Sequence, residues 1–366
     1  MLWMRGWWLP GALLFLGGLL GPSRELEQEP LPGPRREGEV RGVWFFRSRP
    51  TDWDAVMEEL QRAGLNSIFV RVGRGGSVIY PSQVLPTEAW ARELPHDEVL
   101  RAIEAAHRHG IAFHAWRVCF HMGSAPRDDF ERLAREDRLV RDPQGKQAHW
   151  ANPADPRNFE TELRAFIELV EKYPLDGIHF DYIRYPDEPH FFFDYGEVSR
   201  RRFQEEMGIT VARWPQDVLE GPLQLAYEDW CRRQIDRLVE AVHREVKRRK
   251  PWVQISAAVW RHHYLYSTVI KQNWPLWLEK GWLDFAVPMD YVPQHGEFEA
   301  KVREQVSLAR GRGGMVIGIG AWLLKRPEDL LRQVEILRHY GADGFVLFSY
   351  NAEQIHEHLN ALSQGP

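Results

Sequence analysis

The feature that most constrains this chain is a regular alternation of short apolar segments with longer amphipathic ones, which starts near residue 40. The short segments are rich in β-branched and aromatic residues and apolar on both faces, which is typical of strands buried in a parallel sheet. They lie at 41–46, 67–72, 111–118, 176–182, 253–259, 283–290, 315–320 and 344–349. Helical patterns lie between them at 52–63, 98–109, 158–173, 223–250, 297–311 and 327–340. This alternation predicts an α/β fold.

Eight strands spread over roughly 310 residues predict a single-domain (β/α)8 barrel, the TIM-barrel architecture. The alternative is a doubly wound open sheet, which normally has a glycine-rich loop after its first strand. The segment Phe45-Phe46-Arg47-Ser48 is not such a loop. The fourth and fifth strands are separated by a long insertion of roughly 70 residues, and long loops of this kind often form substrate clefts.

The first 39 residues differ from the rest of the chain. Arg5 precedes an apolar run over 6–20, which predicts a secretory signal peptide or an N-terminal membrane anchor over residues 1–21. The proline-rich polar segment 22–39 predicts a disordered linker, and the barrel is then expected over 40–360. We therefore expect a secreted, periplasmic or envelope-associated protein, tethered to the membrane if the N-terminal segment is not cleaved.

Barrel enzymes carry their chemistry at the C-terminal ends of the strands. Alternation along 176–182 places Gly177, His179 and Asp181 on one face and larger apolar side chains, Tyr182 among them, on the other. The polar face is expected to point into the barrel, with Asp181 at the mouth and His179 one layer below. A carboxylate near an imidazole favours proton transfer, although a structural aspartate paired with Arg184 fits the same pattern.

Other strand ends supply further candidates. By the same alternation, Arg71, His114, Trp116 and Trp260 are expected to line the cleft. The sixth strand ends in Asp290 and Tyr291. Asp290 is a candidate second catalytic carboxylate, but alternation turns it outward if Tyr291 faces inward, unless a bulge re-aims it.

The composition excludes some functions. A net charge of −5 and a pI near 6.3 provide no basic surface, so no nucleic-acid partner is expected. His107 and His109 diverge around a helix, and adjacent His262 and His263 cannot easily bind one ion, so no metal or other cofactor is predicted. Sixteen tryptophans suit the flat apolar faces of sugars, although they fit a large core equally well.

Several strings of the sequence are characteristic. They are Arg41-Gly-Val-Trp44, the segment from Leu65 to Arg71 leading to Tyr80-Pro-Ser82, Ala106 to Trp116, Asn152-Pro153, Leu175 to Pro186, Gly281-Trp-Leu-Asp284, Ile317-Gly-Ile-Gly320 and Gly344 to Tyr350. In this order, from about residue 39 to about 352, the chain resembles glycosyl hydrolase-like family 10. Those proteins are exported bacterial barrels related to glycoside hydrolases.

The resemblance has informative departures. Many members carry two successive aspartates after the phenylalanine of the fourth strand, whereas here Asp181 is followed by Tyr182. The strand is also similar to the catalytic strand of family 18 chitinases, but Ile183 occupies the position of their acid glutamate. The resemblance thus implies Asp181 as the catalytic carboxylate and argues against a chitinase.

The resemblance implies cleavage of O-glycosidic bonds in an extracytoplasmic glycan, with peptide-free peptidoglycan strands as one substrate acted on by relatives. Such hydrolysis normally needs two carboxyl groups. The partner of Asp181 stays open between Asp290, Asp187, Glu188 and Asp194, or an N-acetyl amide of the substrate. The residues expected to contact substrate are Arg71, His114, Trp116, Asn152, His179, Arg184, Tyr185, Trp260 and Tyr291. Two alternatives are a non-catalytic glycan-binding barrel and an envelope scaffold that retains the cleft.

Overall fold

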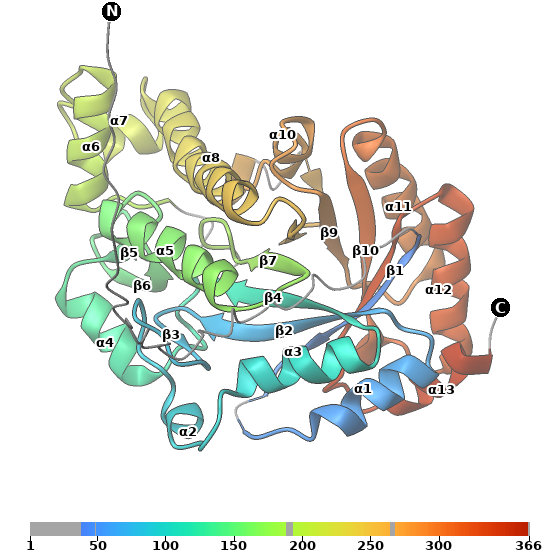
Figure 1. Ribbon diagram of the computed structural model, residues 1–366. Helices are drawn as coiled ribbons and strands as arrows, with labels where there is room; N and C mark the ends of the chain where they lie inside the picture. Colours follow the sequence, from blue (N-terminus) through green and yellow to red (C-terminus); the bar gives the residue numbers. More distant parts are fainter. Residues whose placement is uncertain (1–37, 48, 188–192, 264–267, 365–366) are drawn as a thin grey trace, which may run out of the picture. The chain divides into compact units, whose positions relative to one another are not determined.

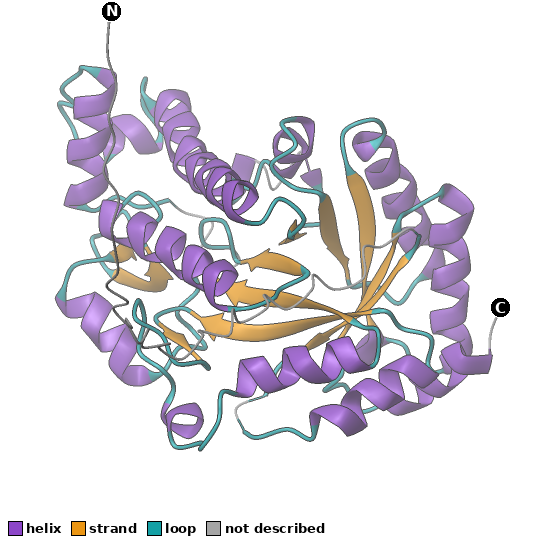
Figure 2. Ribbon diagram, in the orientation of Figure 1, coloured by secondary structure: helices purple, strands orange, loops and turns teal. Residues whose placement is uncertain are grey.

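Eight parallel strands close into a barrel, and a helix follows each of them along the chain (Figures 1 and 2). The computed structural model describes residues 38–47, 49–187, 193–263 and 268–364. The barrel strands are β1 Val40–Phe45, β2 Ser67–Arg74, β4 Ala112–Val118, β7 Gly177–Asp181, β8 Gln254–Val259, β9 Phe285–Asp290, β10 Gly314–Gly320 and β11 Gly344–Phe348. Each pairs with the next in this order, and β11 pairs with β1. The predicted (β/α)8 barrel is confirmed, and the open sheet is excluded.

The outer layer contains one helix for each strand, shown in purple around the orange strands in Figure 2. These helices are α1 Trp53–Arg62, α3 Glu98–Arg108, α5 Pro156–Lys172, α8 Gln224–Arg249, α10 Trp274–Glu279, α11 His295–Ala309, α12 Pro327–Tyr340 and α13 Ile355–Gln364. The six predicted helices agree with this set to within two residues at each end. Local signals explain the agreement: the Asp52 side chain caps α1, and left-handed Gly341 ends α12. Helices α10 and α13 were not predicted.

Three insertions interrupt the simple repeat. After β2 come the short strand β3 Ser77–Val78 and helix α2 Ala89–Arg92. After β4 come helix α4 Arg127–Arg135 and the hairpin of β5 Leu139–Arg141 with β6 Gln147–Ala151. After β7 come α6 Glu197–Met207 and α7 Gln216–Leu219, which precede α8. The predicted long insertion after the fourth barrel strand is therefore present, whereas the other two insertions were not predicted.

The barrel interior is filled by side chains from alternate positions of the strands. Trp44, Phe69, Trp116 and Phe285 belong to one buried cluster that is separate from the larger core under the helices. Close packing there requires a glycine in β7, because a Cβ atom at Gly177 would lie 2.2 Å from Nδ1 of His114. This filling blocks the centre of the barrel and leaves its C-terminal mouth as the place for a cavity.

The expected signal segment at 1–21 lies outside the described residues, as does the expected linker at 22–39 apart from Gly38 and Glu39. None of the helices in the described part of the chain combines the length and apolar character that a membrane-spanning helix needs.

Candidate active site

A cavity of about 410 Å³ opens at the C-terminal ends of the barrel strands, and we call it the mouth cavity. Its ionisable side chains are Arg71, His121, Asp181, Arg184, Asp187 and Arg261. Its aromatic side chains are Phe46, Trp116, Tyr182, Trp260, Tyr291 and Phe348. The predicted residues Arg71, Trp116, Asp181, Arg184, Trp260 and Tyr291 therefore come together in one wall.

Asp181 is the last residue of β7 and is only 7% exposed. Its Oδ2 accepts a hydrogen bond of 3.0 Å from Nε1 of Trp116, and its Oδ1 accepts one of 2.7 Å from the amide of Tyr182. Burial raises the pKa of Asp181 to about 6, against the opposing effects of Arg184, these two donors and Arg71. The carboxyl group is thus oriented by two donors and titrates near neutral pH.

Tyr182 departs from the alternation that the sequence predicts. Its φ of 50° lies in the left-handed region, where non-glycine residues are uncommon. The chain turns there, so the ring of Tyr182 lines the mouth cavity beside Asp181 and also packs against the larger core outside the barrel interior. The apolar packing predicted for Tyr182 is thus present, and the turn of the backbone adds its position in the cavity wall.

Arg184 links the second carboxylate of the cavity to its aromatic wall. Its Nη2 donates to Oδ2 of Asp187 over 2.9 Å. Its guanidinium also lies over the rings of Tyr182 at 4.6 Å, Trp150 at 5.0 Å and Trp260 at 5.6 Å. A cation held between several aromatic faces is fixed in position, so Asp187 is held too.

His121, which was not among the predicted site residues, also lines the cavity. Its ring stacks on that of Tyr182 with a centroid distance of 4.4 Å. Burial, assisted by the charge of Arg184, lowers the pKa of His121 to about 4, so the imidazole is neutral at neutral pH. The signal that could have found it is its position in the loop directly after β4.

The aromatic wall continues beyond the cavity. The ring of Tyr291 lies 4.9 Å from that of Trp322 and 5.5 Å from that of Phe348. Trp322 belongs to the short 3-10 helix η1 Ala321–Leu323 after β10 and is 42% exposed. An aromatic surface therefore runs from the cavity to the outside of the rim.

Two predicted histidines lie deeper, inside the barrel. His179 is fully buried: its Nε2 accepts from Nε1 of Trp44 at 3.1 Å, and its Nδ1 lies 2.8 Å from Oγ of Ser256. Burial lowers the pKa of His179 to about 3. His114 is also fully buried and stacks on Phe69 at 4.4 Å. Both fill the interior below the cavity and are not part of its wall.

Asn152 and Tyr185 are buried outside the cavity wall. The Nδ2 of Asn152 donates to Oδ2 of Asp194 at 2.8 Å and to Oγ of Ser199 at 3.2 Å. These bonds fix the end of the β5–β6 hairpin to the first turn of α6 and to the segment before it. Tyr185 is fully buried near Phe193. Their contacts are structural, and the same holds for Asp194, whose Oδ1 accepts from the Arg141 amide.

Asp290 faces away from the mouth cavity. It is fully buried and its Oδ1 accepts a hydrogen bond of 2.8 Å from Nε2 of Gln305 on helix α11. Burial raises the pKa of Asp290 to about 8, so the group is largely protonated at neutral pH. Asp290 and Asp181 do not lie together. The register of β9 with its two neighbours is continuous, without a bulge that would rotate Asp290 inward, so strand alternation points its side chain toward the helices.

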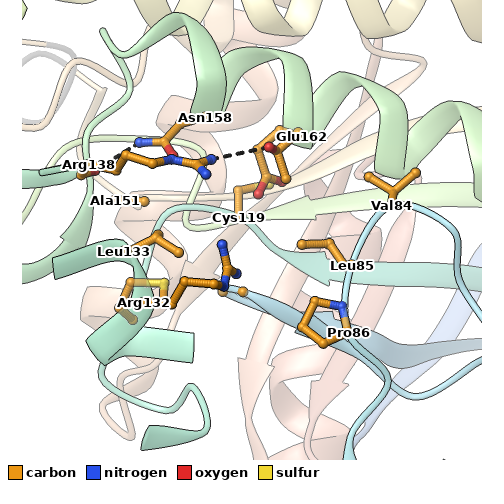
Figure 3. Close-up of a pocket in the computed structure, with 14 residues that line it drawn as sticks. Val84, Leu85, Pro86, Cys119, Arg132, Leu133, Arg138, Ala151, Asn158 and Glu162 are labelled. Atoms are coloured by element: carbon orange, nitrogen blue, oxygen red, sulfur yellow. Dashed lines mark hydrogen bonds between the residues drawn. The ribbon is translucent and has the colours of Figure 1, made fainter. Parts of the chain in front are cut away.

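A second, smaller cavity of about 150 Å³ lies beside the barrel, between β4, α4 and α5. Figure 3 shows Arg138, Asn158 and Glu162 along one side of it. Arg138 donates to Oδ1 of Asn158, and Glu162 accepts two hydrogen bonds of 2.7 Å from Arg117. These charged groups are bound by the protein itself, so we place the candidate active site in the mouth cavity.

The described residues contain no group of three or more histidine, cysteine, aspartate or glutamate side chains that could hold a metal ion.

Comparison with known proteins gives a consistent family. The family model described as Glycosyl hydrolase-like 10 matches residues 39–312. Glycosyl hydrolase DigH of Escherichia coli strain K12 is 22% identical over 307 residues, which cover 69% of this chain and 66% of DigH. Glycosyl hydrolase YngK of Bacillus subtilis strain 168 is 21% identical over 252 residues, which cover 61% of this chain and 46% of YngK. The chain thus spans about half to two thirds of the length of these relatives.

Among solved structures, the glycoside hydrolase domain of PgaB (BpsB) from Bordetella bronchiseptica has a similar fold. The TM-score is 0.67 at 15% identity, with coverage of 89% of this chain and 98% of that domain. This likeness supports the barrel architecture.

Proposed function

Because the chain belongs to the glycosyl hydrolase-like 10 family, we propose that it hydrolyses O-glycosidic bonds of an extracytoplasmic glycan, with Asp181 as the proton-transferring residue. The family supports glycan hydrolysis in general. The observation that carries the assignment to Asp181 is its position in the wall of the mouth cavity, buried and with a pKa of about 6. A carboxyl group that titrates there can hold a proton for the leaving oxygen and still release it.

Glycoside hydrolysis usually needs a second carboxyl group on the other side of the scissile bond. We assign this role to Asp187, since Asp181 and Asp187 are the carboxylates of the described cavity wall. The ion pair with Arg184 holds Asp187 in place for attack on the anomeric carbon or for activation of a water molecule. An N-acetyl group of the substrate is the alternative nucleophile, and in that case Asp181 alone would supply the proton.

The remaining wall residues would bind the sugar. Trp116, Trp260 and Tyr291 offer ring faces for stacking on sugars, and Arg71 offers N–H donors. His114, His179, Asn152 and Tyr185, which the sequence also predicted as substrate contacts, would act through packing beneath or beside this wall.

We propose peptide-free peptidoglycan strands as the natural glycan, on the basis of the family resemblance of the sequence. This substrate lies outside the cytoplasm, in agreement with the proposed export through residues 1–21. Fusion of these residues to a reporter that is active only after secretion tests the export. A reporter that stays in the cytoplasm would contradict it.

The experiment that tests hydrolysis is release of reducing ends from a polysaccharide panel that includes peptide-free peptidoglycan. Wild type should release them, and Asp181→Asn should lose about 10²–10⁴-fold of the rate with its fold intact. Asp128→Asn, which removes an exposed carboxylate from α4, is the matched control and should retain full activity. Equal rates for wild type and Asp181→Asn would contradict the mechanism.

A glycan-binding barrel is the second candidate function. The observation that favours it is that the two carboxyl groups in the described part of the cavity wall already have partners, Asp181 in Trp116 and Asp187 in Arg184. Binding of a glycan without release of reducing ends would support this function. Absence of any glycan binding would favour an envelope scaffold.

A further inference from the structure

The charges of the mouth cavity do not balance. Among the wall residues that the structure describes, three guanidinium groups, those of Arg71, Arg184 and Arg261, face two carboxyl groups. Arg184 and Asp187 neutralise each other in an ion pair of 2.9 Å. Arg71 and Arg261 then remain against the single carboxyl group of Asp181, which is mostly ionised at neutral pH because its pKa is about 6. The described part of the cavity wall therefore carries one more positive charge than negative charges.

Arg71 is the more informative of these two cations. It follows the inward-facing Phe69 by two positions on β2, so its side chain also points into the barrel mouth. Arg71 forms no ion pair or hydrogen bond with any residue that the structure describes, although it is partly buried. Burial and the nearby charge of Arg74 lower its pKa to about 10 against the opposing charges of Glu88 and Asp181, and Arg71 stays charged at neutral pH.

The neighbouring acids accept hydrogen bonds from groups other than Arg71. Glu88 accepts two hydrogen bonds from Arg74, at 2.7 and 2.9 Å, and a third of 3.0 Å from the indole of Trp90. Asp181 already accepts from Trp116 and Tyr182. The guanidinium carbon of Arg71 lies 4.9 Å from the ring centre of Phe46, and this contact restricts where the group can point.

Asp181 and Glu88 attract Arg71 only from beyond hydrogen-bond distance, so its N–H donors have no bound carboxylate among the described residues. Partial burial of such a guanidinium is costly unless a ligand accepts its hydrogen bonds. Sugar hydroxyls can accept its hydrogen bonds but cannot neutralise its charge. A carboxylate does both, because its two oxygens match the planar fork of N–H donors. The chemistry at this point of the wall thus fits an anionic group better than a neutral sugar.

We propose that Arg71 forms a subsite for the carboxylate of an acidic sugar, so that the cavity selects glycans whose sugars bear a free carboxyl group next to the cleaved bond. This inference rests on the proposed function, because it names the substrate class of the same cavity. The carboxylate has two sources in glycans: the ring carboxyl of a uronic acid, and the lactyl ether of muramic acid. The lactyl carboxylate is free when no peptide is attached to it.

Equilibrium binding measured by calorimetry tests the subsite in full-length Asp181→Asn, which cannot turn over its ligand if the mechanism holds. The probes are oligoglucuronate and peptide-free muramic acid oligosaccharides, each beside its carboxyl-reduced counterpart. Arg71→Gln should lose at least 10-fold in affinity for one acidic probe and clearly less for the reduced counterpart of that probe, whose hydroxyl groups can only accept hydrogen bonds from Arg71. Arg71→Lys keeps the positive charge but lacks the planar fork of N–H donors. Its affinity for the acidic probe should lie between that of the protein with Arg71 and that of Arg71→Gln.

Arg62→Gln removes an exposed arginine from α1 and is the matched control, with no expected change for any probe. The probe that responds to Arg71 identifies the source of the carboxylate. Equal losses for acidic and reduced probes overturn the subsite, and so does failure of every acidic probe to bind. The two proposals fail separately. Arg71-dependent binding without release of reducing ends by wild type overturns hydrolysis alone, whereas hydrolysis with no preference for acidic over reduced glycans overturns the subsite alone.

Discussion

The indole of Trp116 donates a hydrogen bond of 3.0 Å to Oδ2 of Asp181, and this bond joins the inward faces of the adjacent strands β4 and β7 at the barrel mouth. The ring of Trp116 is itself held edge-on by Phe46 at 6.0 Å and by Phe348 at 6.4 Å. The orientation of the carboxyl group is therefore determined by packing from three strands. Its protonation depends on the same contact, because a donated hydrogen bond favours the ionised form.

The first prediction concerns the pH dependence of hydrolysis. If protonated Asp181 is the acid, the rate falls as the pH rises through about 6, the pKa of this group. Trp116→Phe removes a donor that lowers this pKa, so the midpoint of the fall should move up by about one pH unit, with a lower maximal rate. Rates of reducing-end release from pH 4 to 9 measure both effects. Trp252→Phe, at an exposed tryptophan before β8, should leave the midpoint in place. A downward shift in Trp116→Phe would contradict the assignment.

The second prediction concerns Asp290. The sequence predicts it as a candidate catalytic carboxylate, but in the structure it accepts a hydrogen bond from Gln305. Its pKa is raised from 3.8 to about 8, so the folded state binds its proton more tightly than the unfolded state does. The stability from this group is fully present below pH 3.8 and is lost as the pH rises through about 8. Asp290→Asn removes the titration. The melting temperature of this variant relative to wild type should therefore increase between pH 5 and pH 9, by an amount corresponding to a few kcal/mol at most.

Activity separates the two aspartates. Asp290→Asn should cleave glycan at close to the wild-type rate, because its side chain contacts helix α11 and not the mouth cavity. If the difference in melting temperature between wild type and Asp290→Asn is the same at every pH from 5 to 9, Asp290 is ionised in the folded state. A loss of activity as large as that of Asp181→Asn would restore it as a catalytic candidate.

The third prediction concerns the buried ion pair between Arg117 of β4 and Glu162 of α5. Two hydrogen bonds of 2.7 Å join them, and both residues are at most 5% exposed. Glu162→Gln leaves the Arg117 charge buried without a counter-ion, which should lower the free energy of unfolding by about 3–5 kcal/mol. Urea denaturation measures this loss. Glu131→Gln breaks the exposed pair with Arg127 and should leave the denaturation midpoint unchanged. Equal midpoints for the two variants would contradict the prediction.

The barrel could be predicted from the sequence because its signal is local. Buried parallel strands read as short apolar runs, and helix caps such as Asp52 and Gly341 mark the boundaries. Helix α10 was missed since its six residues are too few to show a helical period. The β5–β6 hairpin was missed because its short strands resemble the loop segments around them.

The site could be predicted only in part. Alternation identified the inward face of each strand, and it correctly brought Arg71, Trp116 and Asp181 to one wall. Alternation does not indicate how far below the barrel mouth a side chain lies, so His114 and His179 were expected at the cleft although they fill the interior. Alternation also cannot predict contacts between distant segments, such as the stacking of Trp150 from the β5–β6 hairpin against Arg184.

The last prediction concerns Trp322, which extends the aromatic wall outside the mouth cavity. Its ring lies 4.9 Å from Tyr291 and 5.6 Å from Phe348, and 42% of the residue is exposed. A sugar bound in the cavity would continue along this surface, so Trp322 should contact only longer chains. Trp322→Ala should raise KM for long oligosaccharides by about 3- to 10-fold, the range expected for loss of one aromatic contact. The kcat should not change, and neither should KM for substrates short enough to stay inside the cavity. Trp252→Ala removes an exposed tryptophan beside the N-terminal end of β8 and provides the matched control. KM is measured for oligosaccharides of increasing length. An equal increase at all lengths would mean that Trp322 supports the fold of the rim. No increase at any length would exclude Trp322 from the binding surface.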